Sequence, residues 1–390
     1  MRPRVLLAQP SLQPPGGGNG VAAWMLQALV PDHHVTVLSW HPVEVAPINR
    51  FFGTALHPSD FDAVLLPRAW TALVDRLPVP AALLRHSLFM RYTRRISAQY
   101  DAVIGACNET DYGRPGIQYV HHPTYLRPRP EVDYRWYHRP RVALDAYYRI
   151  ADRIAGASRA GMRANLTLAN SRWTAARIAA PLQVEPRVLH PPVADPAPPV
   201  PWPDRTPCFL AVGRISPEKQ LERVIRIVAA VRRAFPAVTL TIVGTWDRGT
   251  RRYYHAIRRQ AAAMGDWITF RHDLPRDVVR HLMASSRYGL HAMPNEHFGM
   301  APAEMARAGM IVWVPDDGGQ VEIVQDPSLT YHDEADAVAR ITAVLADPAR
   351  EAALAAALAS RTADLSPARF CEAIRAAVGE MLAGPRPSAS

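Results

Sequence analysis

The chain has 390 residues, of which 48% are hydrophobic and 21% charged, and its formal net charge at pH 7 is +10. It is too long for one ordinary hydrophobic core and fits two domains of usual size, with the composition of a soluble globular protein. No apolar run approaches the length of a bilayer-spanning helix, and residues 1–11 lack the hydrophobic stretch of a secretory signal.

Three cysteines, Cys107, Cys208 and Cys371, stand far apart without the spacing of a metal or redox site. Free thiols are typical of a reducing compartment, so we expect a cytoplasmic protein. The positive charge favours an anionic partner, whether phosphate groups, an acidic membrane surface or nucleic acid. A peripheral position at the inner face of a membrane stays open as an alternative.

Of the 45 basic side chains one is lysine, Lys219, and the other 44 are arginine. Lysine carries a compact point charge that arginine does not reproduce. We therefore interpret Lys219 as a functional ammonium group. The alternative is that the single lysine is present by chance and has no special role.

The N-terminal segment predicts a short buried strand at residues 4–8, a glycine-rich loop at residues 16–20 and an apolar helix at residues 21–29. This order resembles a dinucleotide-binding unit, but Val21 stands where its third glycine is required. The second predicted strand, residues 35–40, also lacks the terminal acidic residue that grips a ribose. We therefore exclude NAD as a cofactor.

Further strands are predicted at residues 63–67, 102–106 and 117–121, alternating with helices as in a doubly wound sheet. Between them, residues 76–100 contain five arginines and no acidic residue. Apolar side chains recur there at every fourth position, and several arginines lie off that stripe: Leu84, Leu88, Tyr92 and Ile96, with Arg91, Arg94 and Arg95. This amphipathic helix either lies on an anionic membrane or packs its stripe in the core.

Two histidines, His121 and His122, end the strand at residues 117–121, where open α/β sheets place their ligands. A metal pair would need a third ligand of suitable spacing, and none is visible, so we expect no metal. Residues 125–153 are rich in tyrosine, tryptophan and arginine, which suits an acceptor-side surface.

A Pro-rich linker separates the two predicted domains, since eight of the seventeen residues 191–207 are proline. We assign residues 1–190 to the first domain and 208–365 to the second. The C-terminal helix, residues 366–383, is expected to cross back to the first domain. The final residues, 384–390, are expected to be disordered.

The second domain begins with a strand at residues 208–212, which is followed by Gly213, Arg214 and, five residues later, Lys219. Because Lys219 follows Glu218 and not glycine, the segment is no Walker P-loop. Further strands at residues 238–244 and 267–270 predict another doubly wound domain.

Residues 294–309 form the segment around which the chain is organised. An apolar strand at residues 288–293 leads into a loop, and Pro302 suits the first turn of a helix with Ala301 as its N-cap. The free N–H groups of residues 299–301 then form an anion site, flanked by Glu296 in the loop and Glu304 in the first turn. A ligand with a negative centre and hydroxyl-rich ends, such as a nucleotide sugar, fits this arrangement.

The pattern of Glu296, seven residues and Glu304, with Phe298-Gly299 inside, resembles the signature of retaining nucleotide-sugar glycosyltransferases of the GT-B fold, family 4. Gly213, Arg214 and Lys219 resemble the Gly-Arg and Lys motif of this family, and residues 318–324 resemble its Gly-Gly-x-x-Glu turn. Residues 119–123, Tyr-Val-His-His-Pro, are similar to a segment of its mannosyltransferases.

This resemblance implies two doubly wound Rossmann-like domains that face each other across a cleft. It implies that four residues serve catalysis: His121, or His122 as the fallback, with Arg214, Lys219 and Glu296. It implies that the donor is bound by Gly17, Gly18, Gly213, Arg214, Lys219, Asp273, Leu274, Glu296, Phe298, Gly299, Met300, Ala301 and Glu304. The nucleotide base is left uncertain, because this chain has Arg271-His272-Asp273 where a glycine is usual.

The activity so implied is transfer of a hexose with retention, without a metal or redox cofactor. The resemblance favours mannose from GDP-mannose, with UDP-sugars close behind, and a saccharide, lipid-linked or small-molecule acceptor. The alternatives are a nucleotide-sugar epimerase or hydrolase and a non-catalytic binding protein. Nucleic acid is not an expected partner, because no nucleic-acid module is recognisable.

Overall fold

The computed structural model describes residues 2–76, 82–123 and 141–384. It divides into two compact units, residues 1–192 with 368–390 and residues 193–367. Most of the Pro-rich segment therefore belongs to the second unit, where Val193 is fully buried and its N–H donates to the carbonyl of Leu365. The tail expected to be disordered lies outside the described residues from 385 onward, and so do residues 125–140 of the aromatic, arginine-rich segment.

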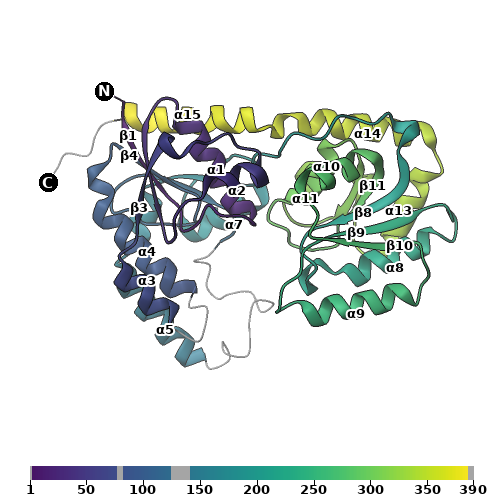
Figure 1. Cartoon of the computed structure of the whole chain (residues 1–390), viewed down its shortest axis with the longest axis horizontal. Coiled ribbons are helices and arrows are strands. Elements are labelled where there is room, and N and C mark those ends of the chain that lie inside the picture. The colour runs from purple at the N-terminus through teal and green to yellow at the C-terminus, as the bar shows by residue number, and fades with distance from the viewer. Residues whose placement is uncertain (1, 77–81, 124–140, 385–390) are drawn as a thin grey trace. The chain divides into compact units, whose positions relative to one another are not determined.

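The first unit is a seven-stranded parallel sheet in the order β3-β2-β1-β4-β5-β6-β7 (Figure 1). Its strands are β1 (Arg4–Ala8), β2 (His34–Ser39), β3 (Phe61–Leu65), β4 (Ala102–Gly105), β5 (Ile117–Val120), β6 (Leu166–Ala169) and β7 (Arg187–Val188). Its helices are α1 (Gly17–Leu29), α2 (Val45–Phe52), α3 (Arg68–Asp75), α4 (Ala82–Ile96), α5 (Arg141–Ala155), α6 (Arg159–Arg163), α7 (Arg172–Leu182) and α15 (Pro367–Ala383).

The central strand β1 is apolar throughout because both of its faces are covered. Val5 and Leu7 belong to a core cluster that includes residues of α1 and α15, whereas Leu6 and Ala8 belong to one that includes Phe89 of α4. Period-2 alternation sends successive side chains to opposite faces of the sheet. Helices therefore cover both faces, as the doubly wound prediction requires.

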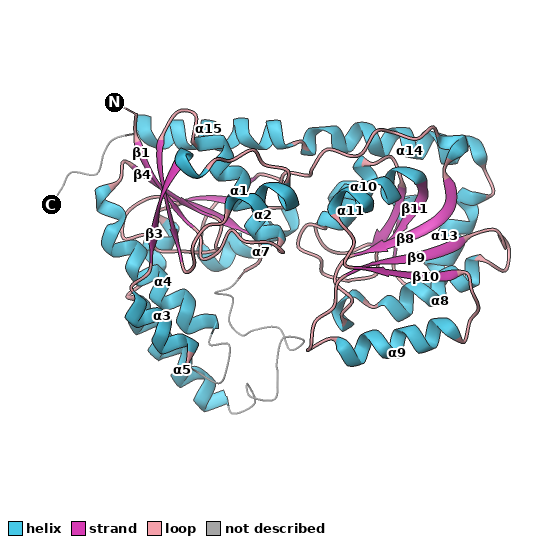
Figure 2. Ribbon diagram, viewed as in Figure 1, coloured by secondary structure: helices cyan, strands magenta, loops and turns pink. Residues whose placement is uncertain are grey.

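The second unit is a six-stranded parallel sheet in the order β10-β9-β8-β11-β12-β13, with helices on both sides (Figure 2). Its strands are β8 (Thr206–Val212), β9 (Thr239–Gly244), β10 (Ile268–His272), β11 (Ser286–Leu290), β12 (Ile311–Pro315) and β13 (Thr330–Tyr331). Its helices are α8 (Leu221–Val231), α9 (Arg251–Ala262), α10 (Arg276–Ser285), α11 (Met300–Arg307), α12 (Val321–Val324), α13 (Glu334–Leu345) and α14 (Pro348–Thr362).

Helix α1 begins earlier than predicted. Gly16 has a φ of 142°, a backbone conformation that favours glycine, and the helix starts at Gly17 and runs through the glycines that we expected in a loop. The prediction of a loop up to Gly20 was therefore wrong. Gly17 and Gly18 occupy the first turn of α1, where backbone N–H groups are free of intrahelical bonds.

The apolar stripe of α4 is a packing face. Leu88 and Tyr92 pack against the core cluster that contains Ile96, and α4 lies along α5 (Figure 1). Arg94 forms an ion pair with the buried carboxylate of Asp111, and Arg91 donates to the carbonyl of Ile154 at 3.2 Å. The stripe therefore serves the fold of the unit. Among the described residues, no helix combines the length and the apolar character needed to cross a bilayer.

We expect the folded protein to lose stability in acid because of His86 on α4. Burial lowers the pKa of His86 to about 4, against a small opposing effect of a hydrogen bond with the backbone of Glu109. The unfolded chain therefore binds more protons than the folded one between about pH 6.5 and 4, and folding is weakened as the pH falls through that window. At about 1.4 kcal/mol per pH unit, we expect a loss of up to about 2 kcal/mol between pH 6.5 and 5.

Urea unfolding at several pH values measures this effect, with His86→Asn as the test variant. The exposed His41 provides the matched control, His41→Asn. We expect the acid dependence to be smaller in His86→Asn than in the wild type and unchanged in the control. Equal acid dependence in all three proteins would contradict the assignment.

Candidate functional site

The loop after β8 is folded tightly against the end of β9. Gly213 has a φ of 144°, and a Cβ on Gly244 would lie 1.8 Å from the carbonyl oxygen of Gly213. No side chain fits at Gly244, so the two backbones approach as closely as glycine allows. A short 3-10 helix, Pro217–Lys219, then returns the chain toward the sheet. The Lys219 side chain consequently lies beside Gly213, with Cε 3.7 Å from where a Cβ of that glycine would be.

Lys219 forms an ion pair with Glu296, with Nζ 2.8 Å from Oε2. Both side chains are largely buried, at 20% and 16% exposure, and Nζ also lies 3.2 Å from the sulfur of Met293. Two of the four predicted catalytic residues, 77 positions apart in the sequence, are thus brought together. Arg214, in contrast, is exposed and pairs with Glu218 at 3.0 Å, a surface contact of small energetic value.

His291 is a member of this group that the sequence did not reveal. It directly follows β11, is 5% exposed, and its Nε2 lies 3.3 Å from Oε2 of Glu296. The apolar run predicts a strand at residues 288–293, which includes this position, whereas β11 ends at Leu290. The available signal was a polar side chain inside an apolar run immediately before the loop.

The environment of Glu296 keeps its carboxyl group ionised. Burial alone would raise the pKa of Glu296, but the hydrogen bond with His291 and the positive charge of Lys219 outweigh burial and hold that pKa well below its usual range. Glu296 is therefore a carboxylate at neutral pH and can only accept hydrogen bonds. A sugar hydroxyl can donate to such a group.

Helix α11 begins two residues earlier than the predicted N-cap implied. Gly299, with a φ of 102°, is the N-cap in place of Ala301, and its carbonyl accepts from the N–H of Ala303 at 3.0 Å. Helix geometry leaves the N–H groups of Gly299, Met300 and Ala301 without intrahelical acceptors, as predicted for an anion site. The Phe298 ring is buried in the core, so it anchors the loop rather than lining a ligand surface.

Glu304 lies in the second turn of α11 and not in the first, because the helix starts at Met300. Its carboxylate forms an ion pair with Arg276 at the start of α10, and its side chain is 12% exposed. Each of the two motif carboxylates therefore has its own cationic partner. We did not predict Arg276, which lies outside every motif that we identified.

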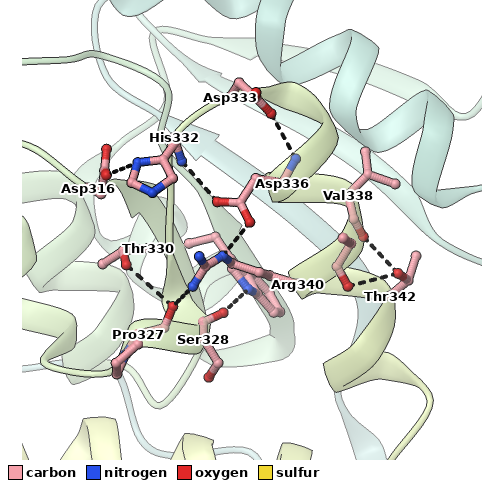
Figure 3. A network of polar contacts seen from close by, with 12 residues as sticks. Asp316, Pro327, Ser328, Thr330, His332, Asp333, Asp336, Val338, Arg340 and Thr342 are labelled. Carbon is pink, nitrogen blue, oxygen red and sulfur yellow. Dashed lines mark hydrogen bonds and ion pairs between the residues drawn. The ribbon is translucent and has the colours of Figure 1, made fainter.

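The glycine turn after β12 holds the Glu296 loop. The N–H of Gly319 donates to the carbonyl of Glu296 at 2.7 Å, and Gln320 Nε2 donates to the carbonyl of Met293 at 3.0 Å. A second polar network lies where β12 and β13 end. In it His332 contacts Asp316, and Arg340 contacts Asp336 (Figure 3). The turn thus couples two neighbouring loops at the carboxyl edge of the sheet.

Gly318→Ala is expected to disturb this site. Gly318 has a φ of 89°, and a Cβ there would lie 2.5 Å from the carbonyl oxygen of Glu296. We expect a loss of about 2–4 kcal/mol in unfolding free energy, together with displacement of Glu296. Urea unfolding measures the first effect and a crystal structure the second.

Gly379 provides the matched control, because it lies in α15 and a Cβ there meets nothing within 4 Å. We expect Gly379→Ala to stabilise the protein by roughly 0.5–1 kcal/mol. A Gly318→Ala protein as stable as Gly379→Ala would contradict the close approach of the two loops.

Asp273 and Leu274 follow β10. Asp273 is exposed and has a φ of 53°, and Leu274 packs partly against the core. Aspartate is one of the few side chains that tolerate the left-handed region. This explains how the loop keeps a left-handed turn in a segment where a glycine was expected.

In the first unit the structure brings His121 and Gly18 together. A Cβ on Gly18 would lie 3.2 Å from Nε2 of His121. The N–H groups of His121 and His122 both donate to Oδ1 of Asn108, at 2.8 and 3.2 Å. His122 is exposed, so His121 is the histidine that faces the start of α1. Within the described part of the chain, no group of three or more His, Cys, Asp or Glu side chains is arranged to hold a metal ion.

Comparison with known families gives one match in the second unit. The family model of glycosyl transferases group 1 matches residues 197–361. Several curated relatives carry the name GDP-Man:Man(3)GlcNAc(2)-PP-Dol alpha-1,2-mannosyltransferase. The relative from Yarrowia lipolytica is 31% identical over 125 residues, covering 30% of this chain and 20% of its own. The relative from Homo sapiens is 27% identical over 119 residues, covering 28% and 24%. This chain thus spans about a fifth to a quarter of the length of these two relatives.

Solved structures match over nearly the whole chain. Anabaena Alr3699/HepE in complex with UDP and glucose has a TM-score of 0.67 at 15% identity, covering 97% of this chain and 100% of the other. WaaG, a glycosyltransferase involved in lipopolysaccharide biosynthesis, has a TM-score of 0.67 at 16% identity, with coverage of 95% and 99%. At this level of identity the likeness establishes the fold, and the prediction of two doubly wound GT-B domains is confirmed.

Proposed function

Because residues 197–361 carry a glycosyl transferases group 1 domain in a chain with the GT-B fold, we propose that this protein is a retaining glycosyltransferase. It moves a hexose from a nucleoside diphosphate sugar to a hydroxyl group of an acceptor. The bond from the anomeric carbon to the donor phosphate breaks, and a bond from that carbon to the acceptor oxygen forms. The acceptor proton passes to the departing phosphate.

The observation that carries the proposal is the Lys219–Glu296 pair in the loops at the carboxyl edge of the second sheet. Departure of the diphosphate concentrates negative charge on its oxygens. The ammonium of Lys219, the guanidinium of Arg214 and the N–H groups at the start of α11 stabilise that charge. With these groups supplying the electrostatic stabilisation, we propose a reaction that uses no metal ion and no redox cofactor.

The remaining residues orient the two ends of the donor. Glu296 accepts hydrogen bonds from the hexose, and Glu304 accepts them from the ribose. His121 of the first unit contacts the transferred sugar, and the loop with Asp273 and Leu274 contacts the base. These roles follow the resemblance.

We propose GDP-mannose as the donor and a lipid-linked or other saccharide as the acceptor. The Tyr-Val-His-His-Pro segment and the names of the curated relatives, which contain GDP-Man and PP-Dol, both support this choice. UDP-sugars are the competing donors, since Anabaena Alr3699/HepE binds UDP. We also propose that the protein acts in the cytoplasm, at the inner face of a membrane when its acceptor is a lipid.

A thermal-shift panel of GDP, UDP, ADP and dTDP tests the donor, because a ligand that binds only the folded state raises the melting temperature. We expect the largest rise with GDP. A radiolabelled GDP-mannose assay with and without a lipid-linked saccharide then tests transfer. Product that forms equally well without an acceptor would indicate a hydrolase or epimerase, and binding without any product would indicate a non-catalytic protein.

A further inference from the structure

His291 is fixed at the carboxyl edge of the second sheet from two sides. Its N–H donates to the carbonyl of Trp313 on β12 at 2.9 Å, and its carbonyl accepts from the hydroxyl of Tyr331 on β13. Its imidazole is 6% exposed. Because backbone and ring are both enclosed, the ring has little freedom to change its position.

The imidazole and the Lys219 ammonium share one carboxylate oxygen. Nε2 of His291 lies 3.3 Å from Oε2 of Glu296, and Nζ of Lys219 lies 2.8 Å from the same atom. A carboxylate oxygen only accepts, so Nε2 of His291 must carry the hydrogen. Glu296 is therefore held by one donor on a buried ring and one donor at the end of a long side chain.

These two donors differ in how easily they can move away from the Glu296 carboxylate. Lys219 has a flexible four-carbon stem and lies in the wall of a small pocket that Gly213, Arg214 and His291 also line. An anion bound at Gly213 and Arg214 would compete with Glu296 for the ammonium. Once Lys219 turned to that anion, His291 would be the donor that still holds the carboxylate.

We propose that His291 is a positioning residue, whose Nε2–H keeps Glu296 in place while Lys219 exchanges between Glu296 and the diphosphate of the donor. The inference rests on the proposed function for the identity of the anion. It assigns to His291 no contact with the sugar or with the reacting atoms. Its effect on turnover passes through Glu296.

The electrostatics agree with this geometry. Burial, and then the charge of Lys219, lower the pKa of His291, against the raising effect of Glu296. The ring is therefore neutral at pH 7. A neutral donor fixes the carboxylate without cancelling its charge, which leaves Glu296 able to accept from a sugar hydroxyl.

Three variants test the proposal. His291→Leu removes the donor, and His291→Gln keeps an N–H near the position of Nε2. The matched control is His33→Leu, because His33 is also buried and its Nδ1 lies 3.1 Å from the carbonyl of Leu29 in the first unit. The readouts are kcat and KM with GDP-mannose, the Kd of GDP by calorimetry, and the crystal structures with bound GDP.

We expect His291→Leu to lower kcat about 10- to 100-fold through misplacement of Glu296, while the Kd of GDP changes less than about threefold. We expect His291→Gln to recover most of that loss and His33→Leu to keep the wild-type kcat. The GDP-bound structure of His291→Leu should show the Glu296 carboxylate displaced, because Lys219 then no longer holds it.

The proposal is overturned if His291→Leu keeps the wild-type kcat, if it weakens GDP binding as much as it lowers kcat, or if Glu296 stays in place in the GDP-bound variant. Absence of any turnover in the wild type would contradict the proposed function instead. The position of Glu296 in the variant then decides the role of His291 by itself.

Discussion

Lys219→Ala lowers kcat about 100- to 1,000-fold, the effect expected when a preorganised charge is removed from a developing anion. The same change weakens GDP binding about tenfold, the equivalent of one charged hydrogen bond. Both losses follow from the position of Nζ, which is 2.8 Å from Glu296 in the loop that precedes α11. Steady-state kinetics with GDP-mannose and calorimetry with GDP measure them.

Two further variants make the Lys219 experiment specific. Lys219→Arg keeps the charge but replaces a compact ammonium with a planar guanidinium, so we expect it to restore only part of kcat. Arg259→Ala removes an exposed cation from α9 of the same unit and should leave kcat and the Kd of GDP unchanged. A Lys219→Ala protein that matches Arg259→Ala in both measurements would refute the role of Lys219.

Glu296→Gln is expected to lower kcat by a similar factor, about 100- to 1,000-fold, while the Kd of GDP changes little. The amide keeps the shape of the side chain but lacks the charge that pairs with Lys219 and accepts from His291. The hexose therefore loses its acceptor, whereas the diphosphate keeps its cations. Glu296→Gln is thus expected to change kcat alone, whereas Lys219→Ala changes both kcat and the Kd of GDP.

The control for Glu296 is Glu372→Gln, an exposed carboxylate on α15. Unfolding in urea accompanies the kinetics, because Glu296→Gln leaves the partly buried Lys219 without its counter-ion. Wild-type kcat in Glu296→Gln would show that the carboxylate does not orient the donor. A parallel loss of GDP affinity would instead assign Glu296 to the nucleotide.

The alternation of apolar runs with helical periodicity predicted both parallel sheets, because strands covered on two faces read as continuous apolar segments. Helix starts were less predictable. The N-caps of α1 and α11 are glycines with positive φ, Gly16 and Gly299, and a sequence does not reveal whether a given glycine adopts that conformation. The predicted loop up to Gly20 and the predicted N-cap at Ala301 failed for this reason.

In the candidate site, too, some features could be predicted from the sequence and others could not. Lys219 and Glu296 could be assigned to one site because each belongs to a recognisable motif, and the fold brings them together. The partners of the motif residues could not be predicted, because Arg276 and His291 meet Glu304 and Glu296 only through tertiary packing. The sequence around Arg276 carries no pattern that marks it, and His291 is marked only as a polar side chain inside an apolar run.

Protection of Lys219 from an amine-reactive reagent tests most directly whether these loops bind a nucleoside diphosphate sugar, since Lys219 is the only lysine of the chain. Peptide mass spectrometry follows modification of Lys219 with and without saturating GDP-mannose or UDP-glucose. Our account predicts that one of these donors slows modification of Lys219 strongly and that mannose alone does not. An unchanged rate of modification with every nucleoside diphosphate sugar would contradict it.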